Sequence, residues 1–271
     1  FFVFGWCGQA AACGYAFQVL SDELGGREPL RMAQQSLDFI CANAKFYDKG
    51  FYTWYAYDKG QWVTGRPPEW LSQGQAMYNV ANAIRVARKK GIACDPWEAF
   101  LKRACDFHAQ RILSDDWHSE STNEAFFIGP LCKAFELLGH ETYQRAAIKA
   151  GQVYAQRHVS MREPYWGGTL DASCEDKEGA FAALQGFLEL YEMTGETQWL
   201  ERAEHACDVA LTYVVVWDID LPAGRLRNHG FKTRGWTAVS VQNMHIDVYG
   251  VLIAPDVYRL GKLTKQEDLK K

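Results

Sequence analysis

A short pattern recurs along this chain and constrains its fold more than any other feature. Each copy has an apolar helical stretch, a glycine, an acidic or hydroxyl residue, and a second amphipathic stretch; the clearest copy spans residues 188–203. A glycine at this point can take the left-handed conformation that ends a helix, and the polar residue that follows opens the next helix. The turn glycines of the five copies are Gly26, Gly91, Gly139, Gly195 and Gly261. The chain is therefore expected to fold as antiparallel helix hairpins, four of them complete and a fifth begun.

The length of the repeat favours one arrangement of these hairpins. The turn glycines are roughly 50 to 65 residues apart, whereas open solenoids usually repeat every 34–47 residues or so. The extra length lies between hairpins, and the first helix of each hairpin is the more apolar, as an inner helix should be. We therefore predict an all-α fold, an (α/α) toroid or barrel of helix hairpins with aromatic-rich loops. Alternation over residues 51–57 adds one short β-hairpin that turns at Asp58 to Gly60.

A resemblance to a known group of proteins lies in one turn, Thr-Gly-Glu-Thr-Gln-Trp-Leu-Glu-Arg-Ala at residues 194–203, and in the repeat form itself. In both, the sequence resembles the six-hairpin glycosidase-like superfamily, whose (α/α)6 toroid serves many glycoside hydrolases and polysaccharide lyases. The resemblance covers most of the chain and implies a carbohydrate-active enzyme. Because the chain starts at Phe1 without Met and holds fewer than six hairpins, we expect residues 1–271 to be a single toroid-type catalytic domain, truncated from a six-hairpin barrel.

Composition argues against several other classes of function. The formal net charge is −4 and the sequence pI about 6.0, whereas a protein held to nucleic acid by electrostatics is normally basic. No apolar run approaches the ~18 residues that a membrane span needs. The eight cysteines include no C-x-x-C pair and several fall in apolar helical patterns, so we interpret them as small buried hydrophobes. This usage favours a reducing, cytoplasmic location over secretion, and no cofactor or metal is predicted.

The starts of the first helices should share one rim, because the hairpins run in parallel around a barrel. Amides and carboxylates stand at these starts, and the adjoining loops carry aromatic rings, which together suit the apolar faces and hydroxyl edges of sugars. Arg234 lies in a basic loop that would clamp a carboxylate or sulfate on the substrate. Alternatively, the polar residues only cap helices and the rings only pack the loops. The predicted substrate-binding residues are Trp6, Gln9, Trp54, Trp70, Gln73, Gln75, Trp117, Tyr165, Trp166, Glu175, Arg234, Trp236, Gln242 and Asn243.

Hydrolysis of a glycosidic bond usually needs two carboxyl groups, one to protonate the leaving oxygen and one to activate water or attack. The candidates at the predicted rim are Asp176, Glu178, Asp247 and Glu124, with His245 as a second proton carrier or a ligand of sugar hydroxyls. Side chains two apart on a helix diverge by about 200°, so Asp176 and Glu178 should not both face the cleft. We predict that one of them works with Asp247, and opposed carboxylates in a closed barrel favour inversion. The substrate is expected to be an oligosaccharide or polysaccharide, with uronate units as one possibility.

Rival functions use some of the same residues. A polysaccharide lyase would use His245 and either Tyr249 or Tyr165 as base and acid, with Arg234 neutralising a uronate. A sugar epimerase on this toroid typically relies on a pair of histidines, and only His245 stands at a predicted helix start. A zinc enzyme would use Cys7, Cys174 and His245 as ligands with water in the fourth position. A non-catalytic helical-repeat scaffold is the remaining alternative.

Overall fold

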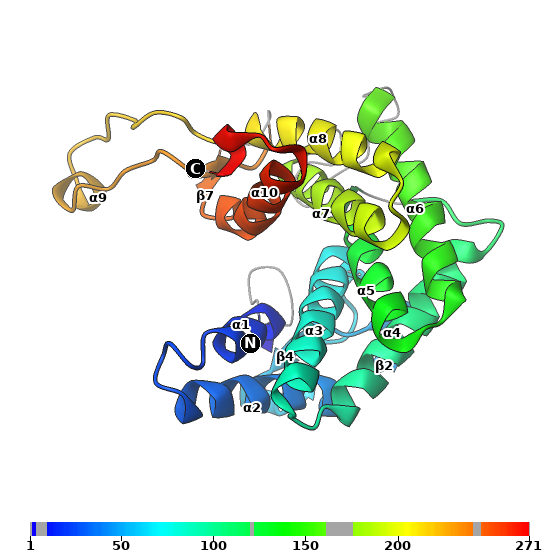
Figure 1. The fold of residues 1–271 in the computed structure, drawn as a ribbon. Helices are drawn as coiled ribbons and strands as arrows, with labels where there is room; N and C mark the ends of the chain where they lie inside the picture. Colours follow the sequence, from blue (N-terminus) through cyan, green and yellow to red (C-terminus); the bar gives the residue numbers. More distant parts are fainter. Residues whose placement is uncertain (1, 4–9, 120–121, 161–175, 241–244, 271) are drawn as a thin grey trace. The chain divides into compact units, whose positions relative to one another are not determined.

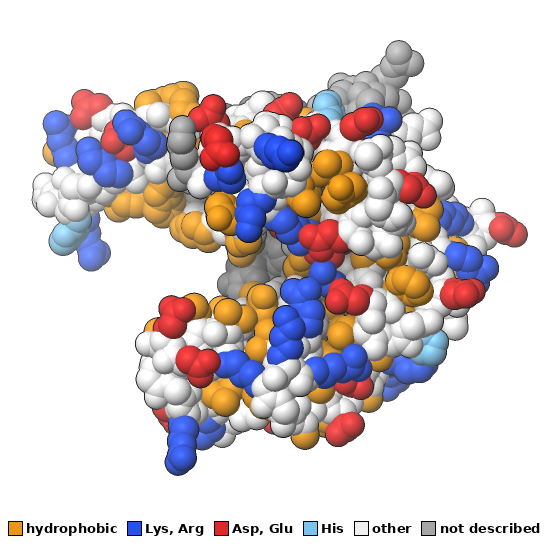
Figure 2. All heavy atoms as spheres, viewed as in Figure 1, with side chains coloured by type: hydrophobic (Ala, Val, Ile, Leu, Met, Phe, Trp, Pro, Cys, Tyr) orange, Lys and Arg blue, Asp and Glu red, His pale blue; other side chains and the backbone are white. Residues whose placement is uncertain are grey.

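The computed structural model describes residues 2–3, 10–119, 122–160, 176–240 and 245–270. The chain divides into two compact units, the first made of residues 1–118 and 126–152 and the second of residues 119–125 and 153–271. Charged side chains of both signs are interspersed over the face shown in Figure 2. In the described part of the chain, no helix combines the length and the apolar character needed to cross a bilayer.

Helix hairpins build the first unit (Figure 1). Its helices are α1 (Ala10–Val19), α2 (Arg27–Asn43), α3 (Trp70–Lys90), α4 (Asp95–Leu113), α5 (Ile128–Leu138) and most of α6 (Glu141–Ser160). Helix α1 packs on α3, and α3 packs on α5, so the first helices of successive hairpins are neighbours. Helix α2 packs on α4 in the same way, and the two helices in each of the first two hairpins also pack together. The result is two layers of helices, as the repeat pattern predicts.

The second unit continues the pattern with α7 (Lys177–Thr194) and α8 (Thr197–Leu211), followed by α10 (Gly250–Thr264), which packs on both. Helix α7 is buried around most of its circumference, and Phe181, Leu184, Phe187 and Leu188 are all in the core. An extended arm with the short helix α9 (Arg225–Asn228) separates α8 from α10. The chain described here ends with the 3-10 helix η4 (Glu267–Lys270).

Three of the predicted turn glycines end helices as expected. Gly91, Gly139 and Gly195 follow α3, α5 and α7 with φ of 66°, 74° and 72°, in the left-handed region. Gly26 also has a positive φ, but it precedes α2, because α1 has already ended at Val19.

The fifth turn is predicted wrongly. Gly261 lies inside α10, and the left-handed residue is Lys265, with φ 59°. A Cβ on Gly261 would lie 2.8 Å from the Cβ of Leu269 in η4. This glycine therefore allows η4 to fold back closely against α10, and it does not end the helix.

Short strand pairs replace some of the expected loops and helices. Strand β4 (Trp54–Ala56) pairs with β5 (Gln61–Trp62) across a turn that ends at Gly60 in the left-handed region, which confirms the predicted hairpin. Strand β1 (Phe2–Val3) pairs with β4, and β2 (Phe46–Tyr47) pairs with β3 (Gly50–Phe51). The expected helix start at residues 240–247 is wrong, because Ile246–Asp247 forms strand β7, paired with β6 (Thr237–Ala238). Helix α10 begins only at Gly250.

The described cysteines are free thiols. Cys94, Cys105, Cys132 and Cys207 are buried, which fits their interpretation as small core residues, whereas Cys13 is exposed and Cys41 half-buried. Burial is the main cause that raises the pKa of the Cys41, Cys94, Cys105 and Cys207 thiols. These four side chains are therefore neutral at physiological pH. Cys7 and Cys174 lie outside the described residues.

Candidate active site at the start of helix α7

A group of charged side chains surrounds the first turn of α7. Asp176 is the N-cap of this helix, and its Oδ1 accepts a hydrogen bond from the backbone N of Gly179 at 3.2 Å. Asp176 is fully buried and pairs with Ser240 in an isolated β-bridge. The carboxylate therefore opens the helix, as an N-cap residue should, and also places negative charge in the interior.

Lys177 connects this turn to strand β7. Its backbone N donates to the carbonyl of Val239 at 2.9 Å, which ties the helix start to the residue that directly follows β6. The Lys177 side chain is fully buried and its Nζ donates to Oδ2 of Asp247. The same Nζ lies 3.6 Å from Oε1 of Glu178 and 5.3 Å from the centroid of the Tyr249 ring. One buried ammonium group thus contacts two carboxyl groups and an aromatic face.

Asp247 is held by further donors. Its Oδ1 accepts from Thr237 Oγ1 at 2.8 Å and from the backbone N of Tyr249 at 3.0 Å. An ionised carboxylate offers about four lone-pair sites. With Lys177, three donors from the described residues occupy three of these sites.

Glu178 has the opposite environment. It is 5% exposed, and its Oε2 has no hydrogen-bond partner among the described residues. Burial, followed by the negative charge of Asp176, raises the pKa of Glu178 to about 8; Asp247 adds to the rise and Lys177 opposes it. A buried carboxyl group with few donors keeps its proton, because the charged form is poorly solvated. At neutral pH, Glu178 is therefore an acid with a proton to donate.

Glu178 and Asp247 have opposite chemical environments. Glu178 is held in the protonated form by burial and by its negative neighbours, whereas Asp247 is bonded to an ammonium group and two neutral donors. Two titratable groups with such different environments are the usual sign of an acid and base assignment. Sequence reasoning named both residues but missed Lys177, which is next to them in the sequence.

The other predicted residues of the second unit differ in how deeply they are buried and in what they contact. Glu124 is buried in the 3-10 helix η3 (Thr122–Phe127), whereas His245 is exposed, two residues before Asp247. Arg234 is exposed, and its backbone N donates to Oδ1 of Asp218 at 3.3 Å. The half-buried Trp236 packs edge-on against Phe231, with ring centroids 4.8 Å apart.

In the first unit, Gln73 and Trp70 belong to the core. Oε1 of Gln73 lies 2.9 Å from Nε2 of His108 and accepts from the backbone N of Phe51, while its Nε2 donates to the carbonyl of Lys49 at 3.0 Å. Gln73 therefore fixes the β2–β3 turn to α3 and α4. Burial lowers the pKa of His108 well below its usual range, so this histidine, which sequence reasoning missed, stays neutral.

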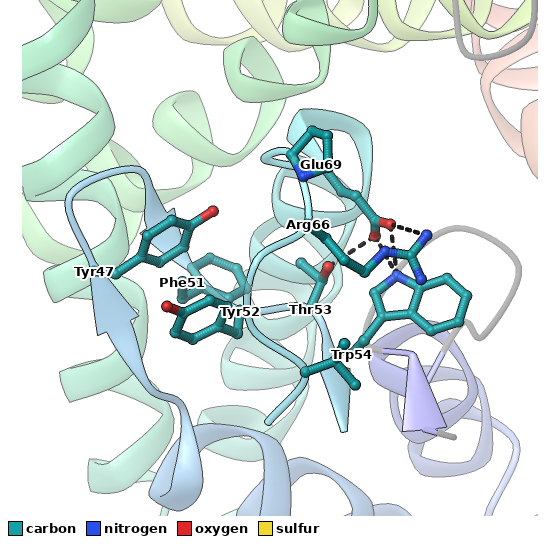
Figure 3. A pocket seen from close by; sticks show the side chains of 9 residues that line it. Tyr47, Phe51, Tyr52, Thr53, Trp54, Arg66 and Glu69 are labelled. Atoms are coloured by element: carbon teal, nitrogen blue, oxygen red, sulfur yellow. Dashed lines mark hydrogen bonds and ion pairs between the residues drawn. The ribbon is translucent and has the colours of Figure 1, made fainter. Parts of the chain in front are cut away.

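Trp70 is 7% exposed and packs against Phe127 and under the guanidinium of Arg111, 4.3 Å from the ring centroid. Gln75 and Trp117 are half-buried, and Lys149 Nζ lies 5.8 Å from the Trp117 ring centroid. Trp54 is half-buried, and its Nε1 donates to the carboxylate of Glu69 at 2.6 Å (Figure 3). The remaining predicted binding residues lie outside the described part of the chain: Trp6, Gln9, Tyr165, Trp166, Glu175, Gln242 and Asn243.

A metal centre was one of the alternatives. Within the described ranges, no group of three or more His, Cys, Asp or Glu side chains is placed to hold a metal ion. Two members of the proposed zinc set, Cys7 and Cys174, lie outside these ranges, and the third, His245, is exposed.

The fold of this chain is similar to that of several solved structures. No family model and no curated protein sequence matches this chain. Among solved structures, a D-mannose isomerase matches 96% of this chain and 71% of its own, with a TM-score of 0.61 and 13% identity. The GH76 α-mannanase of Bacteroides thetaiotaomicron matches 96% and 70%, with a TM-score of 0.57 and 12% identity. The cellobiose 2-epimerase of Spirochaeta thermophila matches 94% and 70%, with a TM-score of 0.60 and 14% identity.

These likenesses confirm the fold predicted from the repeats. The chain shares the (α/α) helix-hairpin fold of these solved structures. At 12–14% identity the likeness concerns the fold. The chemistry of this chain has to be argued from its own residues.

Proposed function

We propose that this chain is a carbohydrate-active enzyme and, within that class, a glycoside hydrolase. The observation that carries the proposal is the buried Glu178, whose pKa is raised to about 8, beside the lysine-bound Asp247. Glycoside hydrolases generally need one carboxyl group that is protonated at the working pH and one that is ionised. The solved structures that share the fold, an α-mannanase among them, process carbohydrates by their names, which supports a saccharide substrate.

The proposed roles follow from the two environments. Glu178 donates its proton to the glycosidic oxygen as the bond to the sugar breaks, since an acid with a pKa near the working pH transfers a proton efficiently. Asp247, held by Lys177, Thr237 and Tyr249, accepts a proton from the attacking water. Lys177 keeps Asp247 oriented toward the start of α7.

A sugar epimerase or isomerase is the second candidate. An isomerase and an epimerase are among the solved structures that share the fold. In that reaction Glu178 would exchange protons with the sugar, with the exposed His245 as the partner acid or base. A protonated carboxyl group could serve either reaction. Hydrolysis also needs a second carboxyl group as base, and Asp247 fits that role, so hydrolysis is the first candidate. The products separate the two reactions.

Mass spectrometry of saccharide products tests the proposal. The chain is incubated with a mannan oligosaccharide, with cello-oligosaccharides and with a uronate-containing oligosaccharide, and the products are weighed. Hydrolysis yields fragments whose summed mass exceeds that of the substrate by one water. An unchanged mass with a new sugar in the chromatogram would indicate epimerisation, and cleavage without added water would indicate a lyase. Unaltered saccharides under all conditions would contradict an enzymatic function.

A further inference from the structure

Thr237 connects the proposed base to the segment that returns from the extended arm. The Thr237 side chain is fully buried, and its Oγ1 donates to Oδ1 of Asp247 at 2.8 Å. We propose that Thr237 is a positioning residue for Asp247, and that the small size of Gly250 is what lets Thr237 take this place. The role of Asp247 as a base rests on the proposed function, whereas the contacts that hold it do not.

Backbone contacts hold Thr237 from two sides. In the β6–β7 pair it lies directly opposite Asp247, so the two side chains project from the same face of the pair. On its other side Thr237 forms an isolated bridge with Val214, and the next residue, Ala238, donates its backbone N to the carbonyl of Tyr213 at 2.9 Å. Thr237 is therefore the middle of three adjacent chain segments, and its backbone is fixed beside Asp247.

The Thr237 hydroxyl binds one end of a carboxylate whose other end is already bound. Lys177 Nζ donates to Oδ2 of Asp247, while Oδ1 accepts from Thr237 and from the backbone N of Tyr249. Donors at both oxygens restrict rotation about the terminal torsion of the side chain, which is otherwise broad. A base must lie within hydrogen-bond reach of the proton that it removes. The hydroxyl thus helps to orient Asp247 and takes no part in proton transfer itself.

Gly250, the first residue of α10, lies against the methyl group of Thr237. A Cβ at position 250 would lie 2.9 Å from Cγ2 of Thr237 and 3.3 Å from the carbonyl oxygen of Gly235. Nonbonded carbon atoms are in favourable contact at about 3.5–4.0 Å, so a larger residue would displace Thr237. Both Oγ1 and Cγ2 are attached to one Cβ, and the methyl group therefore cannot turn aside without moving the hydroxyl away from Asp247.

Helix formation does not explain why this residue is a glycine. Alanine forms helices more readily than glycine, and the φ of Gly250 is not in the positive range that would itself favour glycine. The close approach of Thr237 is the contact that a side chain at this position would disturb. Gly250 and Thr237 therefore act together on the orientation of Asp247.

Two substitutions at Thr237 separate its hydroxyl from its methyl group. Thr237→Val keeps the shape and loses the donor, whereas Thr237→Ser keeps the donor and loses the methyl group. On a saccharide that the chain hydrolyses, we expect Thr237→Val to lower kcat about tenfold with KM little changed, and Thr237→Ser to keep kcat within about threefold. Thr194→Val is the matched control, because it removes a hydroxyl that donates at 2.8 Å near the other end of α7 and should leave kcat unchanged.

Gly250→Ala tests the same placement from the side of α10. We expect kcat to fall about tenfold in this variant, since the new Cβ displaces the Thr237 hydroxyl. Combining Gly250→Ala with Thr237→Ser should restore most of the loss, because serine has no methyl group to meet that Cβ. If the double variant is as slow as Gly250→Ala alone, the contact between these two residues does not position the base.

A resonance of Asp247 itself makes the test independent of turnover. With ¹³C-labelled aspartate, the carboxyl signal of Asp247 is identified by its absence in Asp247→Asn and recorded at pH 7 in each variant. We expect the signal to move in Thr237→Val and in Gly250→Ala, and to keep its position in Thr194→Val. This pattern supports the positioning role even if no saccharide is hydrolysed, a result that would overturn only the proposed function. A signal that does not move in Thr237→Val overturns the positioning role, whether or not the chain is a hydrolase.

Discussion

Replacing Glu178 by glutamine is expected to lower kcat/KM on the saccharide substrate by roughly a hundredfold to ten-thousandfold, the usual range for loss of a general acid. Glutamine keeps the size of the side chain but has no proton to give to a leaving oxygen. In the unchanged protein, kcat/KM should fall as pH rises through about 8, the value to which burial and the charge of Asp176 raise the pKa of Glu178. Above that pH the acid form is lost. Initial rates across pH 5 to 10, for both proteins, measure the effect.

A second glutamate in α7 provides the control. Glu192→Gln, near the other end of the helix, removes an exposed carboxylate 3.5 Å from Arg259 and should leave kcat/KM within a factor of two. Full activity in Glu178→Gln would contradict the assignment. A fall in kcat/KM at the same alkaline pH in Glu178→Gln would contradict the assignment as well.

Replacing Lys177 by methionine is expected to lower the free energy of unfolding by roughly 3–5 kcal/mol, the cost of leaving one half of a buried ion pair. Lys177 is fully buried, and its ammonium is the charged donor to Asp247. Methionine fills a similar volume, so the loss reflects the largely buried Asp247 carboxylate, whose side chain is 18% exposed, left without its ammonium partner, more than a cavity. Urea unfolding at pH 7, followed by circular dichroism, measures it.

An exposed lysine and a double variant make this test specific. Lys262 also lies over an aromatic ring, 5.7 Å from the centroid of Tyr258, but it is exposed, so Lys262→Met should change stability by less than about 0.5 kcal/mol. Adding Asp247→Asn to Lys177→Met should restore much of the loss, because no buried charge then lacks its partner. If Lys177→Met costs no more than Lys262→Met, the buried pair is not a structural element of the site.

The fold was predictable where it depends on local signals. Gly91, Gly139 and Gly195 end their helices through a backbone conformation that glycine adopts without steric cost, and the sequence displays this directly. Gly261 follows a similar apolar helical stretch but has a different role, because it allows η4 to approach α10 closely. Strand β7 was missed because its structure depends on pairing with Thr237 and Ala238, ten and eight residues earlier, which outweighs local helical spacing.

The site was only partly predictable for a related reason. Glu178 and Asp247 were named from their positions near helix starts, but the ion pair that organises them joins residues 70 apart in the sequence. Nothing in the local pattern distinguishes Lys177 from a solvated lysine in a first helical turn. Gln73 and Trp70 show the opposite case, because they stand at a helix start and yet serve the core. Burial and long-range partners decide such roles, and both depend on the folded structure.

The proposed mechanism depends on the protonation state of Glu178, which NMR can measure at the residue itself. With ¹³C-labelled glutamate, the side-chain carboxyl resonance of Glu178 is identified by its absence in Glu178→Gln and followed as pH is raised. We expect a midpoint near 8, because burial and the negative charge of Asp176 disfavour the charged form. A midpoint near the ordinary value of 4.5 would mean that Glu178 is ionised at neutral pH, and it would contradict its role as the general acid.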